Sequence, residues 1–220
     1  TLGLLRDIKG QKSFGLVDDN PLTGISKFLR PKGVVAAIVP STNPLATPLN
    51  NIVNALKTGN SIILAPSPKG VAPLEKLLGY IYAEFDRIGL DHDLVQMVPN
   101  PPSKEKTTRL MQLADMLVVT GSQSNVRSAY SSGTPAIGVG MGNVVTIIDE
   151  TADLDDAAQK IQRSKCFDNA TSCSSENAVI VVDSAYDDCV RALQRVGGML
   201  LDESQTAHLV ATHWRNGHLN

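Results

Sequence analysis

Short apolar runs alternate with segments of helical period from residue 33 onward. The first run, residues 33–39, is rich in β-branched residues, and a proline-containing turn follows it. Further strand-like runs are expected at residues 60–65, 94–98, 116–120, 135–139, 144–149 and 178–183. Because strands that alternate with helices form parallel sheets covered on both faces, the pattern predicts an α/β protein with a doubly wound, Rossmann-like sheet.

Amphipathic helices are predicted between these runs. One is expected to start at Thr47, a candidate N-cap, with Pro48 at its first position. A longer one is predicted from Val71 to Gly89, with one apolar stripe. Others are expected near residues 104–113, 122–131 and 186–196, and one follows Asp149, where acidic residues complement the helix dipole.

Cys173 is the first residue that could carry chemistry. It lies in a loop of small polar residues, 168–176, between a predicted helix and a predicted strand. A thiol in such a loop is not in a packing position, whereas Cys189 falls on the apolar face of the last predicted helix. Lone cysteines are often inert, and no histidine is tied to Cys173 by local sequence, so both interpretations remain open at this point.

Polar residues and glycines also gather where predicted strands end. Asn43 follows the first strand, where ligands bind in open α/β sheets, although an asparagine before a proline is also a common turn residue. Gly121 and Ser122 could offer backbone N–H groups to a phosphate, or Ser122 could simply cap a helix. The glycine-rich segment 138–142 lacks the dinucleotide spacing, so its glycines are more safely interpreted as points of close backbone approach.

The amino-acid composition limits the classes of binding partner and site that are expected. The 220 residues are 42% hydrophobic and carry a formal net charge of -2, which gives no general reason to expect nucleic acid. No apolar run reaches the length of a membrane span, and the first residues do not resemble a secretory signal. The three cysteines form neither an even set nor a metal-ligand spacing, so cytosolic thiols and no metal site are expected.

Several segments together resemble the aldehyde dehydrogenase superfamily, specifically its CoA-acylating branch. The resemblance runs in order across nearly the whole chain and rests on GVVAAIVPSTNP, ALKTGNSIILAPSP, VVTGS, AYSSGTPAIGVGMGN and CFDNATSCSSENAVIV. It implies that the chain is a fragment, with family elements expected before Thr1 and after Asn220. It further implies an NAD(P)-binding domain over residues 1–170 and the beginning of a catalytic domain over residues 171–220.

The resemblance also implies roles for single residues. Cys173 would be the nucleophile and Asn43 a donor to the oxyanion, while Cys166 would be structural. Cofactor-binding positions would be Pro40, Ser41 and Thr42 beside the nicotinamide, Gly121 and Ser122 at the pyrophosphate, and Gly140 near the nicotinamide side of the cleft.

Two departures from the hydrolytic branch refine this expectation. Ala65 stands where hydrolytic relatives carry a lysine that binds the adenosine ribose, so the choice between NAD and NADP stays open. The hydrolytic enzymes have a water-activating glutamate before a Gly-Gly pair, whereas residues 137–142 here contain no carboxylate. The absence of this base fits an enzyme whose thioester is taken by the thiol of CoA.

The resemblance therefore implies a cytoplasmic, homodimeric or homotetrameric enzyme that oxidises a short aldehyde with NAD or NADP and transfers the acyl group to CoA. Acetaldehyde and sulfoacetaldehyde are the candidate substrates. Two alternatives stay open: an acyl-phosphate reductase of the glutamyl phosphate reductase kind, and a non-catalytic nucleotide-binding fragment.

Overall fold

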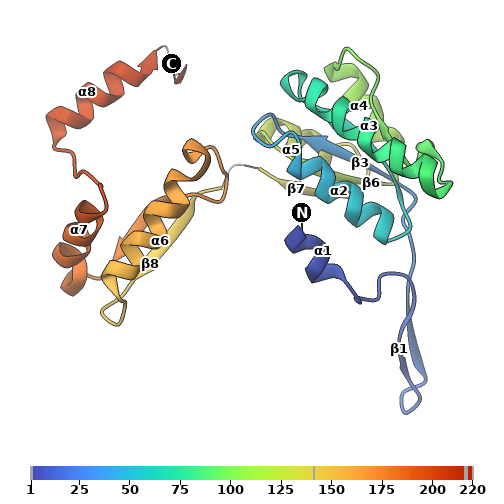
Figure 1. The fold of residues 1–220 in the computed structure, drawn as a ribbon, viewed down its shortest axis with the longest axis horizontal. Helices are drawn as coiled ribbons and strands as arrows, with labels where there is room; N and C mark the ends of the chain where they lie inside the picture. Colours follow the sequence, from blue (N-terminus) through green and yellow to red (C-terminus); the bar gives the residue numbers. More distant parts are fainter. Residues whose placement is uncertain (1, 141, 216–217, 220) are drawn as a thin grey trace. The chain divides into compact units, whose positions relative to one another are not determined.

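The chain divides into two compact units, residues 1–141 and residues 142–220 (Figure 1). The structure is a computed structural model that describes residues 2–140, 142–215 and 218–219. The domain boundary expected at residue 170 lies inside unit 2, and the assignment of nucleotide binding and catalysis to separate domains stays a prediction. No helix in the described residues is long and apolar enough to cross a membrane.

Unit 1 is built around a five-stranded parallel sheet in the order β5-β4-β3-β6-β7. Its elements are α1 (Leu2–Ile8), β1 (Gly15–Asn20), β2 (Ile25–Leu29), β3 (Val34–Val39), α2 (Ala46–Lys57), β4 (Ser61–Pro66), α3 (Val71–Ile88), β5 (Val95–Met97), α4 (Lys104–Leu113), β6 (Met116–Thr120), α5 (Gln123–Tyr130) and β7 (Ala136–Val139). Short 3₁₀ turns precede α3 and β5.

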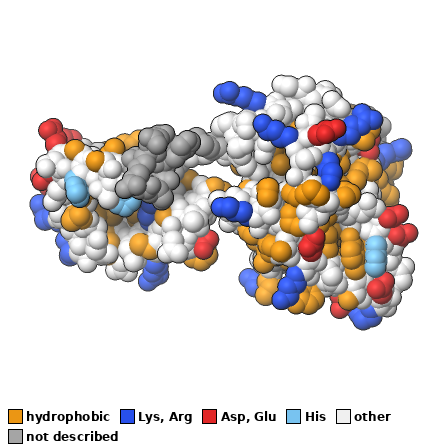
Figure 2. Space-filling model, turned by 90° about the horizontal axis from the view of Figure 1, so that it is seen from above, with side chains coloured by type: hydrophobic (Ala, Val, Ile, Leu, Met, Phe, Trp, Pro, Cys, Tyr) orange, Lys and Arg blue, Asp and Glu red, His pale blue; other side chains and the backbone are white. Residues whose placement is uncertain are grey.

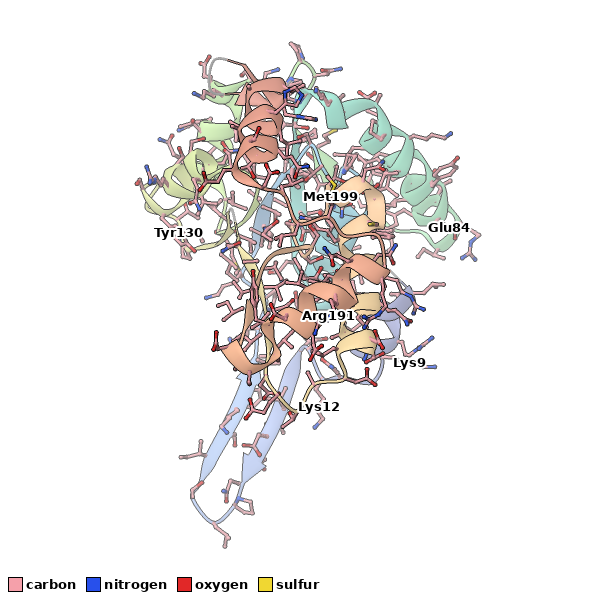
Figure 3. All side chains as sticks on the ribbon, turned by 90° about the vertical axis from the view of Figure 1, so that its left-hand side faces the viewer. Lys9, Lys12, Glu84, Tyr130, Arg191 and Met199 are labelled. Carbon is pink, nitrogen blue, oxygen red and sulfur yellow. The ribbon has the colours of Figure 1, made fainter. Side chains whose placement is uncertain are left out.

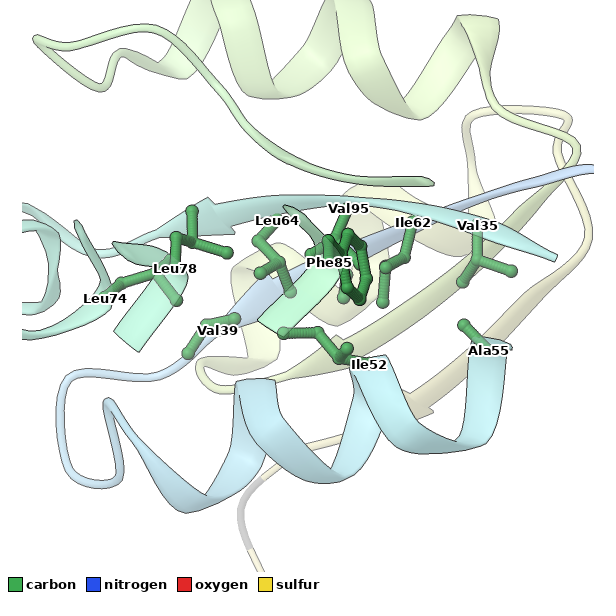
Figure 4. Close-up of a cluster of buried hydrophobic side chains, with 11 residues drawn as sticks. Val35, Val39, Ile52, Ala55, Ile62, Leu64, Leu74, Leu78, Phe85 and Val95 are labelled. Carbon is green, nitrogen blue, oxygen red and sulfur yellow. The ribbon is translucent and has the colours of Figure 1, made fainter. Parts of the chain in front are cut away.

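Two hydrophobic clusters cover the two faces of this sheet. Alternate residues of β3 contribute to each: Val35 and Val39 pack with α2 and α3 in the first (Figure 4), and Ile38 packs with α4 and α5 in the second. Because both faces are covered, the strands are apolar nearly throughout instead of alternating with polar residues. This confirms the doubly wound sheet that the sequence pattern predicts.

Most predicted helix ends are also confirmed. Gly89 closes α3 in a left-handed conformation with φ 73°, which glycine adopts without a steric penalty. The expected cap at Thr47 is wrong, because α2 already begins at Ala46. Leu45 occupies the N-cap position without a side-chain bond, and Asn43, two residues earlier, supplies the capping contact, since its Oδ1 accepts a hydrogen bond from the Ala46 N–H at 3.2 Å.

Unit 2 contains a two-stranded parallel sheet of β8 and β9. Its elements are β8 (Val144–Ile148), α6 (Leu154–Cys166), a 3₁₀ segment η3 (Phe167–Ala170), β9 (Glu176–Val181), α7 (Tyr186–Arg195), α8 (Glu203–His213), β10 (Trp214–Arg215) and β11 (His218–Leu219), with a further 3₁₀ turn before α7. The strand predicted at residues 144–149 thus pairs with β9 and not with the five-stranded sheet. The loop that carries Cys173 connects η3 to β9.

The exposed hairpin of β1 and β2 was not predicted. Its two strands pair with a bulge between Leu16 and Asp18, and its residues are exposed or only partly buried. Without a buried face the hairpin lacks the strict alternation that reveals a strand in sequence. Figure 2 shows more generally that hydrophobic side chains reach the visible surface between interspersed acidic and basic ones.

Candidate active site

The carboxyl edge of the unit 1 sheet brings together five of the expected cofactor-binding residues. From β3 the chain winds outward through β4 to β5, then crosses to β6 on the other side of β3. Pro40, Ser41 and Thr42 follow β3, and Gly121 and Ser122 follow β6. The ends of β3 and β6 therefore form the point at which the winding direction reverses, where open α/β sheets bind ligands.

Asn43 is exposed just after β3, and its amide is oriented by one hydrogen bond. The Oδ1 atom is engaged by the Ala46 N–H, and no partner is recorded for the Nδ2 group among the described residues. The Asn43 side chain is therefore compatible with both interpretations made from the sequence. It is a turn residue that caps α2, and the cap leaves its N–H donors available at the sheet edge.

Ser122 caps α5, as the simpler of the two sequence interpretations predicted. Its Oγ accepts a hydrogen bond from the Asn125 N–H at 3.3 Å and lies 2.9 Å from the Ser124 hydroxyl. The cap fixes the first turn of α5 at the switch point, where its backbone N–H groups favour an anion. Gly121 has φ 153° in the turn that leads from β6 into this cap.

Gly138 in β7 and Gly140 just after it allow close packing against α5. A Cβ on Gly138 would lie 2.7 Å from Val126 Cγ1, and one on Gly140 would lie 2.9 Å from Gln123 Nε2. The N–H of Gly138 also donates to the hydroxyl of Tyr130 at 3.1 Å (Tyr130 is labelled in Figure 3). The expectation of close backbone approach is confirmed for Gly138 and Gly140 but is wrong for Gly142, where a Cβ would have no heavy atom within 4 Å. Gly140 lies beyond β7, two strands from β3.

A buried hydroxyl at the same sheet edge lacks a partner. Ser67, directly after β4, has its Oγ buried without a hydrogen bond among the described residues. Burying a hydroxyl without a partner is unfavourable, so such an atom marks a place where a ligand group could bond. This residue was missed in the sequence because a serine between two prolines carries no distinctive pattern.

The Cys173 thiol is exposed in a loop made of short, local hydrogen bonds. On the N-terminal side, Thr171 donates from its N–H and its hydroxyl to the Asp168 carbonyl. On either side of the thiol, the hydroxyls of Ser172 and Ser174 lie 2.8 Å apart. Cys173 itself is a free cysteine with no recorded hydrogen bond in the described part of the chain.

The backbone before this loop is strained. Asp168, Asn169 and Ala170 have φ values of 50°, 52° and 60°, three successive non-glycine residues in the left-handed region. Aspartate and asparagine tolerate this conformation, but alanine there costs about 1–2 kcal/mol. Strain of this kind is concentrated at functional sites, where the surrounding structure maintains it.

The other two cysteines differ from Cys173 in their surroundings. Cys189 is only 2% exposed, as its place on the apolar face of α7 predicted, and burial raises the pKa of its thiol. Cys166, which we expected to be structural, is exposed at the end of α6. The chain therefore presents two accessible thiols, of which only Cys173 lies in the loop after the strained segment.

A shallow cavity of about 340 Å³ opens beside the thiol loop within unit 2. Ser172 and Ser174, the neighbours of Cys173 in the chain, belong to its lining. The rest of the lining consists of four residues of α6 and η3: Lys160, Arg163, Ser164 and Phe167. Sequence reasoning treated the basic residues here only as the end of a helix, and Phe167 as part of the turn-rich segment that follows it. Glu176, at the start of β9, was also missed, and its Oε2 is buried without a partner among the described residues.

Comparison with known protein families gives a match over most of the chain. The family model described as "Aldehyde dehydrogenase family" matches residues 2–199. The chain belongs to the aldehyde dehydrogenase family.

Relatives within the aldehyde dehydrogenase family point to its acylating members. The chain is 59% identical to the sulfoacetaldehyde dehydrogenase (acylating) of Cupriavidus necator over 219 residues, which is 100% of this chain and 44% of the relative. Among solved structures, an acetylating aldehyde dehydrogenase from Geobacillus thermoglucosidasius superposes with a TM-score of 0.89 at 32% identity, covering 99% of this chain and 48% of that one.

A third relative is a solved structure whose description states what is bound to it. It is a propionaldehyde dehydrogenase from Rhodopseudomonas palustris with bound CoA and an acylated cysteine, matched with a TM-score of 0.78 at 31% identity over 85% of this chain and 43% of that one. The chain thus spans less than half the length of the acylating aldehyde dehydrogenases it matches.

Proposed function

We propose that this chain is part of a CoA-acylating aldehyde dehydrogenase in which Cys173 forms the acyl thioester, and that sulfoacetaldehyde is its substrate. The observation that carries the proposal is the Cys173 thiol, exposed and free in a loop that follows a strained backbone. The acylating relatives support the reaction type, and the high identity to a sulfoacetaldehyde enzyme supports the substrate.

The switch point of unit 1 fits a nicotinamide dinucleotide. It offers the first turn of α5 to a pyrophosphate and the unpartnered Ser67 hydroxyl to a polar group at the same edge. Pro40, Ser41 and Thr42 would contact the nicotinamide end, with Gly140 on the same side of the cleft. Either NAD or NADP satisfies these features, and the bound nicotinamide would supply the hydride acceptor.

In the proposed mechanism the chain itself supplies a nucleophile and an oxyanion donor. The Cys173 thiolate adds to the carbonyl carbon of the aldehyde, and the Asn43 Nδ2 group and the Cys173 backbone N–H donate to the oxygen that becomes negative. The Asn43 cap of α2 contributes by holding the amide in one orientation. After oxidation the acyl group remains on Cys173 as a thioester.

Transfer to CoA completes the reaction. The CoA thiolate attacks the thioester carbonyl, the bond to the Cys173 sulfur breaks, and that sulfur leaves as the thiolate with acyl-CoA as product. Residues 137–142 contain no carboxylate that could activate water in the position used by hydrolytic relatives. A thiolate attacks thioesters readily without such a base, so acyl transfer is favoured over hydrolysis.

The test is NAD(P)H formation by the whole protein with sulfoacetaldehyde or acetaldehyde, with CoA, with inorganic phosphate, or with neither. We expect rapid turnover only with CoA and formation of the corresponding acyl-CoA. Turnover that requires phosphate would identify an acyl-phosphate reductase, and equal turnover without either acceptor would identify a hydrolytic enzyme. The expected homodimer or homotetramer stays a prediction for the whole protein.

A further inference from the structure

The cavity beside the thiol loop is lined from one face of a helix. Lys160, Arg163 and Ser164 are spaced i, i+3 and i+4 in α6, positions that lie on one face of a helix, and Phe167 follows directly after the last helical residue in an extended conformation. The side chains on this face of α6 are polar, whereas the other side of the helix contains the buried Ala158. The cavity is therefore a feature built by helical periodicity, with Ser172 and Ser174 of the thiol loop completing it.

The lining of the cavity carries positive charge. Two cations, three hydroxyls and one aromatic ring form the wall, and no carboxylate does. Of the nearby carboxylates, Asp156 pairs with the cavity residue Lys160 at 2.5 Å, and Asp168 accepts a hydrogen bond from the Thr171 hydroxyl at 2.8 Å. Arg163 has no ion pair or hydrogen bond with any residue that the structure describes.

We propose that this cavity binds the anionic group of a short aldehyde, and that Arg163 is a specificity-determining residue for anionic over neutral substrates. The inference rests on the proposed function and names the feature of the substrate that this site recognises. A sulfonate or carboxylate would receive hydrogen bonds from the guanidinium and from the serine hydroxyls. Lys160 contributes a second, weaker positive charge, because Asp156 already partly neutralises it.

The position of the cavity favours the aldehyde over the other anionic reactants. Ser172 and Ser174 line the cavity and adjoin Cys173 in the chain, so an anion bound there contacts the residues on either side of the nucleophile, although Cys173 itself does not line the cavity. In a short anionic aldehyde the charge is only a few bonds from the carbonyl. The phosphates of CoA, by contrast, are separated from its thiol by the whole pantetheine arm, and those of the dinucleotide are separated from the nicotinamide by a ribose.

The first experiment compares Arg163→Ala with wild type in the whole enzyme, using sulfoacetaldehyde and the uncharged propionaldehyde. Loss of a hydrogen bond to a charged group lowers kcat/KM by roughly 10- to 100-fold. We expect that loss for sulfoacetaldehyde, mainly through KM, with little change for propionaldehyde or in the KM of CoA. Arg163→Lys should recover part of the activity, because it keeps the charge but not the two-pronged geometry.

Lys165→Ala is the matched control. It removes a positive charge from the same last turn of α6, but Lys165 bonds to Asn177 Oδ1 at 3.2 Å and does not line the cavity. Both substitutions remove a favourable charge at the helix C-terminus, and Lys165→Ala also removes the bond to Asn177, so it should lower the melting temperature at least as much as Arg163→Ala does. Only the Arg163 variant should alter the preference between the two aldehydes.

The second experiment needs no turnover. The unreactive sulfonate 2-hydroxyethanesulfonate should slow alkylation of Cys173 by iodoacetamide in wild type and in Lys165→Ala, but not in Arg163→Ala. Equal loss of activity toward both aldehydes, a raised KM for CoA alone, or protection that survives in Arg163→Ala would overturn the inference. If wild type makes no acyl-CoA, the proposed function fails, and the alkylation result still decides whether the cavity takes an anion.

Discussion

Unit 1 and unit 2 differ in how much of their sheets is buried. In unit 1, β3 is buried along almost its whole length, and two clusters of apolar side chains fill both faces of the sheet. In unit 2, α6 lies against β9 and the other face of the small sheet is open, with Ile147 75% exposed. Its thiol loop also follows three residues in an unfavourable backbone conformation.

This difference indicates that the buried sheet of unit 1 contributes mainly to stability, whereas the thiol loop of unit 2 contributes mainly to the chemistry. A doubly buried parallel sheet gains free energy from nearly every strand residue, and it holds loop residues at its edge in fixed positions. The thiol loop gains little from burial and is shaped instead by hydrogen bonds between neighbouring residues. Substitutions in the two units should therefore change different measured quantities, and the following predictions test that separation.

The largest effect is expected for Cys173→Ala. Removal of the nucleophile should lower the rate of acyl-CoA formation by about 10⁴-fold or more, measured as NAD(P)H formation in the whole protein. Because the thiol is exposed and free, the melting temperature should stay nearly unchanged. Cys166→Ala is the control, since it removes the other exposed thiol. Full activity in the Cys173 variant would reject the proposed mechanism.

Substitution of Asn43 should separate the cap from the donor. Asn43→Ala removes both, so the rate should fall by about 10²–10³ and the protein should lose about 1 kcal/mol of stability. Asn43→Asp keeps an oxygen to accept from Ala46 but has no N–H to donate. Its melting temperature should match wild type while its rate stays low. An active Asn43→Asp enzyme would show that the side chain only caps α2.

Leu64→Ala should affect the stability of unit 1 strongly. Leu64 is 0% exposed in the first cluster, and such truncations typically cost about 2–5 kcal/mol. The same kind of change at the exposed Ile147 of β8 should cost far less. Denaturant unfolding of this chain, followed for both variants, measures the difference directly. Equal losses would mean that the open face of unit 2 is buried in solution.

A smaller effect is expected at the strained segment. Ala170→Gly removes the left-handed penalty of alanine, about 1–2 kcal/mol, and adds the greater unfolded-state entropy of glycine, about 0.5–1 kcal/mol. The net change should be a stabilisation of up to about 1.5 kcal/mol in thermal unfolding. Destabilisation would show that the backbone at residue 170 is not strained in solution.

The smallest effect concerns alkaline pH. Burial raises the pKa of the Cys189 thiol above its ordinary value of 9.0. A group whose pKa is higher in the folded state stabilises fully below its unfolded pKa, and this contribution is lost as pH rises through the folded pKa. Stability should therefore decline above about pH 9, and Cys189→Ala should flatten that decline in melting curves.

Much of the α/β pattern could be predicted from the sequence. The apolar runs of β3, β4 and β6 are uninterrupted because both of their faces are buried, and Gly89 marks the end of α3 through its own conformational preference. The burial of Cys189 followed from helical spacing in the same way. These features depend on residues close together in the chain, so their signals are local.

Single contacts in the tertiary structure decided the rest. Three features depend on which groups meet in space: the partner of β8, the capping of α2 by Asn43 and not Thr47, and the lack of a bond at Ser67 within the part of the chain that the structure describes. The cavity of Arg163 is the clearest case. Its helical face could be derived from spacing, but only the fold brings Ser172 and Ser174 opposite that face.

Sequence alone determined the periodic elements and the residue types available for chemistry, because both are local properties. The tertiary structure decided which of those residues share a site, because that depends on contacts between distant parts of the chain.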